Sequence, residues 1–200
     1  MDRARRLGRT GERVLLGLAG SPGAGKSTLA AALVAAVPGS VCVPMDGCHL
    51  DDTVLAALGR RDRKGAPDTF DAGGYVHLLR RLRARDEDVV YAPVYHREQE
   101  QAVAGALAVP REAALVVTEG NYLLADGLFR EVRDLLTETW FVDLDPGERR
   151  ARLVARHVAH GRTPAAAERW VATSDDRNAE LVETTRARAD LVLHLRDRLA

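Results

Sequence analysis

The stretch GSPGAGKST, residues 20–28, decides how this chain folds. It fits the pattern G-x-x-x-x-G-K-[ST], with an apolar run before it at residues 13–20 and apolar residues at helical spacing after it. A strand, a glycine-rich turn and a helix N-terminus together direct backbone N–H groups at anionic oxygens. The sequence therefore predicts a phosphate-binding loop made of Gly20, Ser21, Pro22, Gly23, Ala24, Gly25, Lys26, Ser27 and Thr28, in which Lys26 reaches the outer phosphates and the Ser27 hydroxyl faces magnesium.

Further short apolar runs predict strands at residues 40–45, 114–119, 140–144 and 190–195. Amphipathic patterns between them predict helices that include residues 74–82 and 128–136. Continuous apolar strands alternating with such helices are typical of an α/β fold with a parallel sheet covered on both faces. The least regular stretches, residues 59–74 and 92–110, are long for connections in a compact domain and are candidate binding loops.

The composition narrows the classes of protein that the chain can belong to. Its 200 residues, 46% of them apolar, suit a single domain over residues 1–200. A formal net charge of zero argues against nucleic acid and anionic membrane as partners, and no apolar run approaches the ~18 residues of a membrane span. Without the apolar stretch of a secretory signal we expect a cytoplasmic protein, with Cys42 and Cys48 reduced and packed. The sequence leaves a homodimer open.

Two acidic residues close predicted strands, Asp46 the second and Glu119 the third. The carboxyl ends of parallel strands lie along one edge of a sheet, so both carboxylates are expected to face the phosphate loop. Beside a triphosphate, two such groups suggest one metal contact and one proton acceptor. Each also has a structural alternative, because Asp46 could cap its turn and Glu119 could cap the following helix.

Six segments occur in the order of a known family: GSPGAGKST, PMDGCHLDD, RKGAPDTFD, APVYHRE, VVTEGNYLL and WFVDLDPGERRARLVARH. From Val14 to about Leu195 the chain resembles the uridine kinase, phosphoribulokinase and type I pantothenate kinase group of P-loop kinases. It is most similar to their bacterial uridine-kinase-like branch, also labelled nucleoside kinase-like or fructose-transport-system kinase-like. The resemblance implies a three-layer P-loop fold with a parallel sheet in the order 2-3-1-4-5 and a helical lid. It also implies Asp46 as the base, and Glu119 with Ser27 at magnesium.

The same resemblance places an acceptor pocket in two loops, at about residues 46–74 and 92–110. It implicates Lys64, Phe70 and Asp71 from the first, with His49 nearby, and Tyr95, His96 and Arg97 from the second. Asp71 has a structural alternative as the N-terminal cap of the next helix, and His49 as a surface group. Of 29 basic residues, Lys26 and Lys64 alone are lysines, which hints that a compact charge is needed at these two places.

A run of basic residues follows the fourth predicted strand, at residues 149–162. Such a run is ordinarily a solvated helix face. In the family this segment, about residues 147–165, is the lid that closes on ATP, and phosphoryl transfer needs cations over the moving group. Arg152 and Arg156 lie four residues apart and are the predicted catalytic phosphate contacts together with Lys26, whereas the other arginines are expected to be solvated.

These features favour an ATP- and magnesium-dependent kinase acting on a small-molecule hydroxyl over a nucleotide-dependent switch or a motor ATPase. A guanine-selective switch needs an N-K-x-D segment, and neither asparagine precedes a lysine. A motor would need a basic track or a larger chain. The expected acceptor is a nucleoside or a sugar, with pantothenate or another small organic alcohol or acid as the alternative. Few aromatic side chains are available to stack on a nucleobase, so the acceptor stays open.

Overall fold

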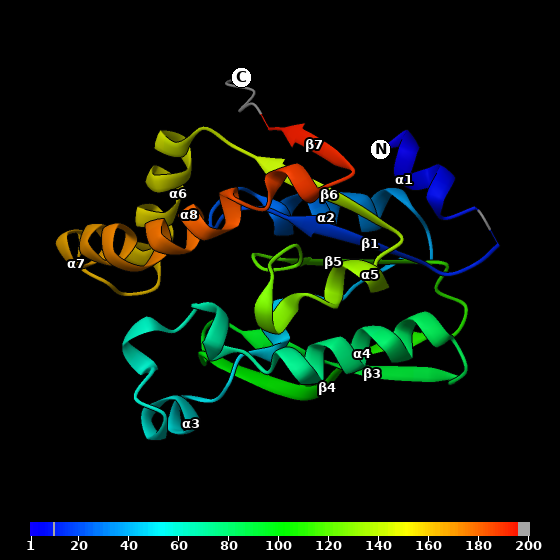
Figure 1. Ribbon diagram of the computed structural model, residues 1–200, viewed down its shortest axis with the longest axis horizontal. Coiled ribbons are helices and arrows are strands. Elements are labelled where there is room, and N and C mark those ends of the chain that lie inside the picture. Colours follow the sequence, from blue (N-terminus) through cyan, green and yellow to red (C-terminus); the bar gives the residue numbers. More distant parts are fainter. Residues whose placement is uncertain (10, 196–200) are drawn as a thin grey trace.

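A five-stranded parallel sheet crosses the centre of the computed structural model, which describes residues 1–9 and 11–195 (Figure 1). Its strands are β1 (Val14–Ala19), β2 (Val41–Cys42), β5 (Leu115–Gly120), β6 (Glu138–Asp143) and β7 (Leu191–His194). They lie in the order β2-β5-β1-β6-β7 and all pair in parallel. Counted within this sheet, that is the predicted order 2-3-1-4-5. Thr10 and residues 196–200 of the predicted 1–200 domain lie outside the described residues.

Successive side chains of a strand point to opposite faces of the sheet, so the hydrophobic core has two parts, one on each face. Leu16 and Leu18 of β1 pack on the face covered by α1 (Asp2–Leu7) and α2 (Lys26–Ala36), whereas Leu15 packs on the opposite face. That opposite face is covered by α4 (Ala72–Ala84) and the short α5 (Val132–Leu135). Because both faces are apolar, the buried strands read as continuous hydrophobic runs, and the predicted three-layer α/β fold is confirmed.

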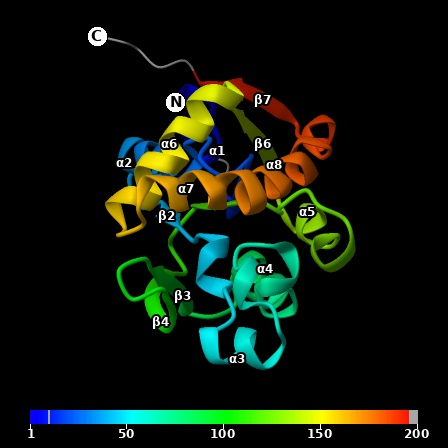
Figure 2. The ribbon, with the colours of Figure 1, turned by 90° about the vertical axis from the view of Figure 1, so that its left-hand side faces the viewer.

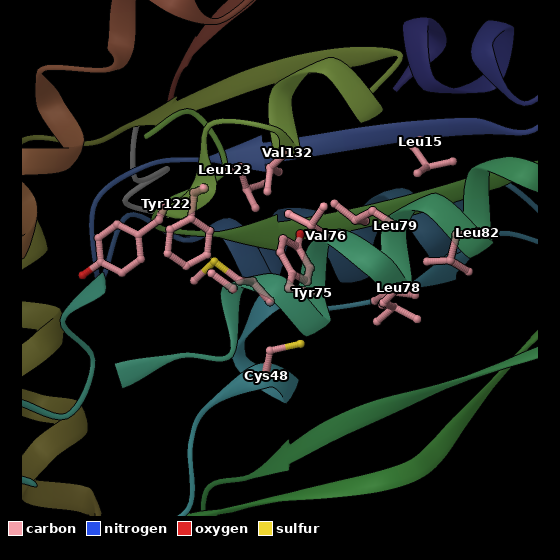
Figure 3. Packing of buried hydrophobic residues seen from close by; sticks show 14 of the residues in the cluster. Leu15, Cys48, Tyr75, Val76, Leu78, Leu79, Leu82, Tyr122, Leu123 and Val132 are labelled. Carbon is pink, nitrogen blue, oxygen red and sulfur yellow. The ribbon is translucent and has the colours of Figure 1, made fainter. Parts of the chain in front are cut away.

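Residues 92–110 are not an irregular loop, so that part of the prediction was wrong. They belong to an antiparallel hairpin of β3 (Val89–His96) and β4 (Gln101–Pro110). Most of β4 is exposed and rich in alanine, which has a low strand propensity and gives no alternating apolar pattern. Figure 3 shows α4 between the central sheet and this hairpin, with Val76 and Leu79 toward β1 and Leu78 toward the hairpin.

Two other predicted elements are shorter than expected. The helix predicted at residues 128–136 is a 3-10 turn, Gly127–Phe129, followed by the four-residue α5. The strand predicted at residues 40–45 ends at Cys42, and Asp46 therefore does not close it. Val43 still donates its N–H to the carbonyl of Val117 (2.8 Å), but Pro44 has no N–H to continue the ladder. The chain turns there into the 3-10 helix η1 (Met45–Cys48), which carries Asp46.

The segment after η1 contains α3 (Asp52–Ala57). The stretch predicted to be irregular, residues 59–74, contains two 3-10 turns, η2 (Arg61–Arg63) and η3 (Pro67–Thr69), and the start of α4. The turn η1 lies directly against the hairpin. A Cβ on Gly47 would lie 2.3 Å from the backbone oxygen of Pro93, so only glycine permits this approach. The position of Asp46 is therefore set by the hairpin as well as by the sheet.

The last third of the chain forms α6 (Pro146–Ala159), α7 (Pro164–Trp170), the π-helical turn η5 (Val171–Asp175), α8 (Asp176–Glu183) and the 3-10 turn η6 (Arg186–Arg188). Figures 1 and 2 show α6, α7 and α8 gathered at one end of the sheet, across from α3, α4 and the hairpin. The predicted lid at residues 147–165 comprises most of α6 and the start of α7; its closure stays a prediction. None of the helices in the described part of the chain has the length and apolarity needed to cross a membrane.

Candidate active site

A cavity of about 680 Å³ lies where the phosphate loop, η1, the hairpin and the lid helices meet. Most of the predicted site residues line it: Pro22, Gly23, Gly25, Lys26, Ser27, Thr28, Asp46, His49, Lys64, Phe70, Tyr95, Arg97, Glu119, Arg152 and Arg156. Five predicted residues do not: Gly20, Ser21, Ala24, Asp71 and His96. The structure therefore brings residues from nearly the whole length of the chain to one place.

The phosphate loop connects β1 to α2 as predicted. Gly20 must be glycine, because its φ is +148° and a Cβ there would lie 2.5 Å from the carbonyl oxygen of Val142. Gly25 caps α2 in the left-handed region at φ 93°, which aims the first N–H groups of the helix into the loop. The loop is also held by α8, since Ser21 donates its hydroxyl to Glu183 (2.7 Å). The result is an anion-binding helix N-terminus at the floor of the cavity.

Lys26 is a buried cation, with 7% of its surface exposed. Its Nζ donates to two neutral oxygens, the Ser21 carbonyl (3.1 Å) and Oδ1 of Asn121 (2.8 Å). Within the described part of the chain no carboxylate lies within salt-bridge distance of Nζ. Burial lowers the pKa of Lys26, while the nearby charges of Glu119 and Asp46 work in the opposite direction. An ammonium held in this way is suited to bind an anion such as a phosphate.

Ser27 and Glu119 form the predicted metal-binding pair. The Ser27 hydroxyl donates to Oε1 of Glu119 at 2.7 Å, and the capping alternative for Glu119 does not apply because its carboxylate points to the loop. Burial, reinforced by the charge of Asp46, raises the pKa of Glu119. A hydroxyl and a carboxylate are oxygen ligands of the kind Mg²⁺ prefers, and phosphate oxygens and water would complete its shell. Among the described residues no group of three or more His, Cys, Asp or Glu could hold a metal ion.

Replacing Glu119 with glutamine is expected to stabilise the nucleotide-free protein at neutral pH by on the order of 1 kcal/mol, or about 2–4 °C in Tm. The raised pKa means that ionising Glu119 in the folded protein costs free energy. The stability that the protonated carboxyl group allows is fully present below the pKa of Glu119 in the unfolded chain, and it is lost as pH rises through the pKa of Glu119 in the folded protein. The difference in Tm between wild type and Glu119→Gln should therefore shrink from pH 8 to pH 5 in thermal unfolding scans. A gap that widens toward pH 5, or no gap at pH 8, would contradict this account.

Asp46 enters the cavity from η1. Its side chain caps no helix, so the capping alternative does not apply, and its Oδ2 accepts a hydrogen bond from Nη2 of Arg97 (3.1 Å). Three quarters of the Asp46 side chain is buried. The carboxylate thus lies in the same cavity as Lys26 and Glu119, and its charge is among those that act on both.

Aromatic rings gather on the side of the cavity that is predicted to bind the acceptor, although the chain has few of them. The ring of His49 lies 3.9 Å from that of Phe70 and 4.8 Å from that of Tyr95, measured between centroids. Burial lowers the pKa of His49, and its Nδ1 lies 2.9 Å from the backbone oxygen of Asp46. His49 is therefore part of the site wall and not a surface group. The Lys64 Nζ lies 5.5 Å from the centroid of the Tyr95 ring.

Asp71 and His96, two of the predicted site residues, do not line the cavity. Oδ1 of Asp71 accepts from the N–H of Gly74 (2.8 Å) and caps α4, which was the structural alternative for this residue. His96 is exposed at the end of β3. The cavity is also lined by polar residues that the sequence analysis did not single out, among them Asp52, Glu100, Asn121 and Asn178. Asn121 could have been found, because it follows Glu119 by two residues at the end of a strand.

The helices α6 and α8 are tied to each other, and α6 is tied to the phosphate loop. Arg149, expected to be solvated, is only 7% exposed; it donates to the Pro22 carbonyl (3.4 Å) and to Oδ1 of Asp176 (2.7 Å). Arg162 was also expected to be solvated, but its guanidinium stacks 4.1 Å from the centroid of the Trp170 ring. Arg156 faces the cavity, and burial, followed by the charge of Arg97, lowers its pKa. The basic residues of this segment thus have different positions: Arg149 is buried, Arg162 stacks on an aromatic ring, and Arg156 faces the cavity.

Comparison with known proteins identifies the family to which the chain belongs. No protein-family model matches the chain. A Schizosaccharomyces pombe protein named "Putative uridine kinase C227.14" is 32% identical over an alignment of 208 positions, which covers 96% of this chain and 87% of that one. A pantothenate kinase of Sorangium cellulosum is 29% identical over 90% of this chain and 68% of its own length. The crystal structure of a "putative fructose transport system kinase" from Silicibacter sp. TM1040 has 37% identity and a TM-score of 0.83, and the match covers 92% of this chain and 91% of that one. With its phosphate loop, sheet order and cavity already described, the chain belongs to the uridine kinase-like group of P-loop kinases.

Proposed function

We propose that this kinase transfers the γ-phosphoryl group of ATP, bound with Mg²⁺, to a hydroxyl group of a nucleoside or a sugar. The observation that carries the proposal is the convergence of Asp46, Lys26 and the Ser27–Glu119 pair on one cavity. A carboxylate beside a phosphate-binding loop is what a hydroxyl acceptor needs, because its proton must leave as its oxygen attacks.

In the proposed reaction Asp46 accepts the proton of the acceptor hydroxyl. The hydroxyl oxygen forms a bond to the γ-phosphorus, the bond from that phosphorus to the β–γ bridging oxygen breaks, and ADP leaves with the bonding electrons. Lys26 and Arg156 offset the negative charge on the moving group. Mg²⁺, when bound by Ser27, Glu119 and the phosphates, adds positive charge at the phosphate oxygens.

The charges that line the acceptor side of the cavity favour a neutral acceptor. Three cations, Arg61, Lys64 and Arg97, face three carboxylates, Asp46, Asp52 and Glu100. They are also paired: Lys64 Nζ lies 2.5 Å and Arg61 Nε 3.2 Å from the Asp52 carboxylate, and Arg97 pairs with Asp46. An anionic acceptor that took Arg97 would leave Asp46 without its partner, and one that took Lys64 or Arg61 would leave Asp52 with a single partner.

The rings of His49, Phe70 and Tyr95 supply an apolar wall for the acceptor. Such a wall can pack on a nucleobase or on the C–H face of a sugar, and the surrounding charges can take hydrogen bonds from its hydroxyl groups. A nucleoside or sugar therefore suits this side better than pantothenate, whose carboxylate needs an unpaired cation.

The acceptor charge is tested by measuring ADP release with Mg-ATP and a panel of acceptors: uridine, cytidine, ribose and fructose as neutral compounds, pantothenate and ribulose 5-phosphate as anions. We expect kcat/KM to be at least about 10-fold higher for the best neutral acceptor, a difference of about 1.4 kcal/mol. Acceleration by pantothenate or ribulose 5-phosphate alone would select the anionic alternative. A slow rate that no acceptor changes would favour a nucleotide-dependent switch.

A further inference from the structure

Arg97 stands at the junction of the hairpin and the turn that carries Asp46. It follows the last residue of β3, and its Nη2 donates to Oδ2 of Asp46 at 3.1 Å. The close approach of Gly47 to the Pro93 carbonyl packs these two segments against each other. The two segments that carry the ion pair are thus held together by backbone contact, and the Arg97 side chain, 46% exposed, reaches Asp46 from the rim of the cavity.

The pair leaves one oxygen of the carboxylate available. No described residue donates a hydrogen bond to Oδ1 of Asp46, whereas Oδ2 is held by Arg97. Lys26 and Arg156 are among the other cations that line the same cavity, but neither is within salt-bridge distance of Asp46 in the described part of the chain. Arg97 is therefore the cation that fixes the direction of this carboxylate.

We propose that Arg97 is a positioning residue for phosphoryl transfer: it anchors Oδ2 of Asp46 so that Oδ1 faces the acceptor hydroxyl. The inference rests on the proposed function, since it assigns Arg97 a role in the step that Asp46 performs. Without the anchor the carboxylate rotates about its Cα–Cβ and Cβ–Cγ bonds and spends less time in the reactive direction. A misplacement of about 1 Å in such a group can cost roughly 10²-fold in rate.

A double-mutant cycle tests this dependence. Wild type, Arg97→Ala, Asp46→Asn and the double variant are compared in ADP release with Mg-ATP and the acceptors of the panel above. Arg97→Ala is expected to lower kcat about 10- to 100-fold, with KM for ATP changed less than about 3-fold. In the Asp46→Asn background the same substitution should change kcat less than about 2-fold, because the group that Arg97 positions is already disabled. Effects that multiply in the double variant would overturn the proposal.

Chemical rescue separates positioning from a general structural role. Guanidinium chloride at millimolar concentration is expected to restore part of the activity of Arg97→Ala and none of that of Asp46→Asn, and Arg97→Lys should retain more activity than Arg97→Ala. Arg80→Ala is the matched control, because Arg80 also forms an ion pair with a carboxylate, that of Glu131, but lies outside the cavity. If wild type shows no acceptor-dependent ADP release, the proposed function fails. If wild type is active and Arg97→Ala equals it, only the positioning role fails.

Discussion

Substitution of Asp46 by asparagine is expected to slow acceptor-dependent phosphoryl transfer by about 10²- to 10⁴-fold, the range over which a general base contributes. The amide has nearly the shape of the carboxylate but cannot take the proton of the acceptor hydroxyl. Among the described residues, Asp46 accepts no hydrogen bond from a helix N-terminus and holds no part of the phosphate loop, so the fold and ATP binding should survive. The measurement is ADP release with Mg-ATP and the best acceptor of the panel, together with KM for ATP.

Asp68→Asn supplies the matched control for Asp46→Asn. Asp68 belongs to the same acceptor segment and also pairs with arginines, Arg60 and Arg63, but it does not line the cavity. It should keep the wild-type kcat within about 2-fold, as is usual for a surface ion pair. An Asp46→Asn variant within 3-fold of the wild-type rate would remove the base from the proposed reaction.

Replacement of Lys26 by methionine is expected to lower kcat/KM for ATP by about 10²- to 10³-fold, the usual cost of removing one group that stabilises the charge of a transition state. Methionine keeps the length of the buried stem, and the loss of a buried cation with neutral partners should not destabilise the nucleotide-free protein. At 100 times its Kd, Mg-ATP stabilises the wild type by about 2.7 kcal/mol, or roughly 5–10 °C in Tm. This shift should disappear in Lys26→Met.

Lys64→Met provides the comparison for that experiment. Lys64 is the other lysine of the chain and lies on the acceptor side of the cavity, where it pairs with Asp52. Its variant should keep the Mg-ATP-induced rise in Tm while its acceptor kinetics change. If the rise in Tm persists in Lys26→Met, or is lost equally in both variants, Lys26 is not the phosphate-binding cation.

The sequence predicted those parts of the structure that depend on local chemistry. The phosphate loop needs glycine at fixed positions and a lysine and serine after it, and each of these residues stands in the chain where the loop mechanism requires it. The buried strands are apolar because both of their faces are covered, so β1, β5 and β6 were predicted to within two residues. Glu119 followed from β5, since the end of a parallel strand places its side chain at the known edge of the sheet.

The features that the sequence did not predict depend on contacts between distant segments. The alanine-rich β4 is a strand because β3 pairs with it, which no property of its own residues indicates. Arg149 is buried because Pro22 and Asp176, far away in the chain, supply its acceptors. The same holds for Asp52, whose neighbours Lys64 and Arg61 lie on a turn that the sequence gives no reason to fold back on α3.

The two lysines of this arginine-rich chain both line the cavity, and they lie in its two halves, Lys26 at the phosphate loop and Lys64 beside Tyr95. Side-chain amines are thus confined to the places where the two substrates are proposed to bind. An amine-selective acylating reagent, read out by peptide mass, would therefore report occupancy of each half separately, with the modification of one lysine blocked by nucleotide and that of the other by acceptor. Apart from the α-amino group of Met1, no other primary amine in the chain reacts with such a reagent, so the composition of the chain itself makes a footprinting assay for its ligands.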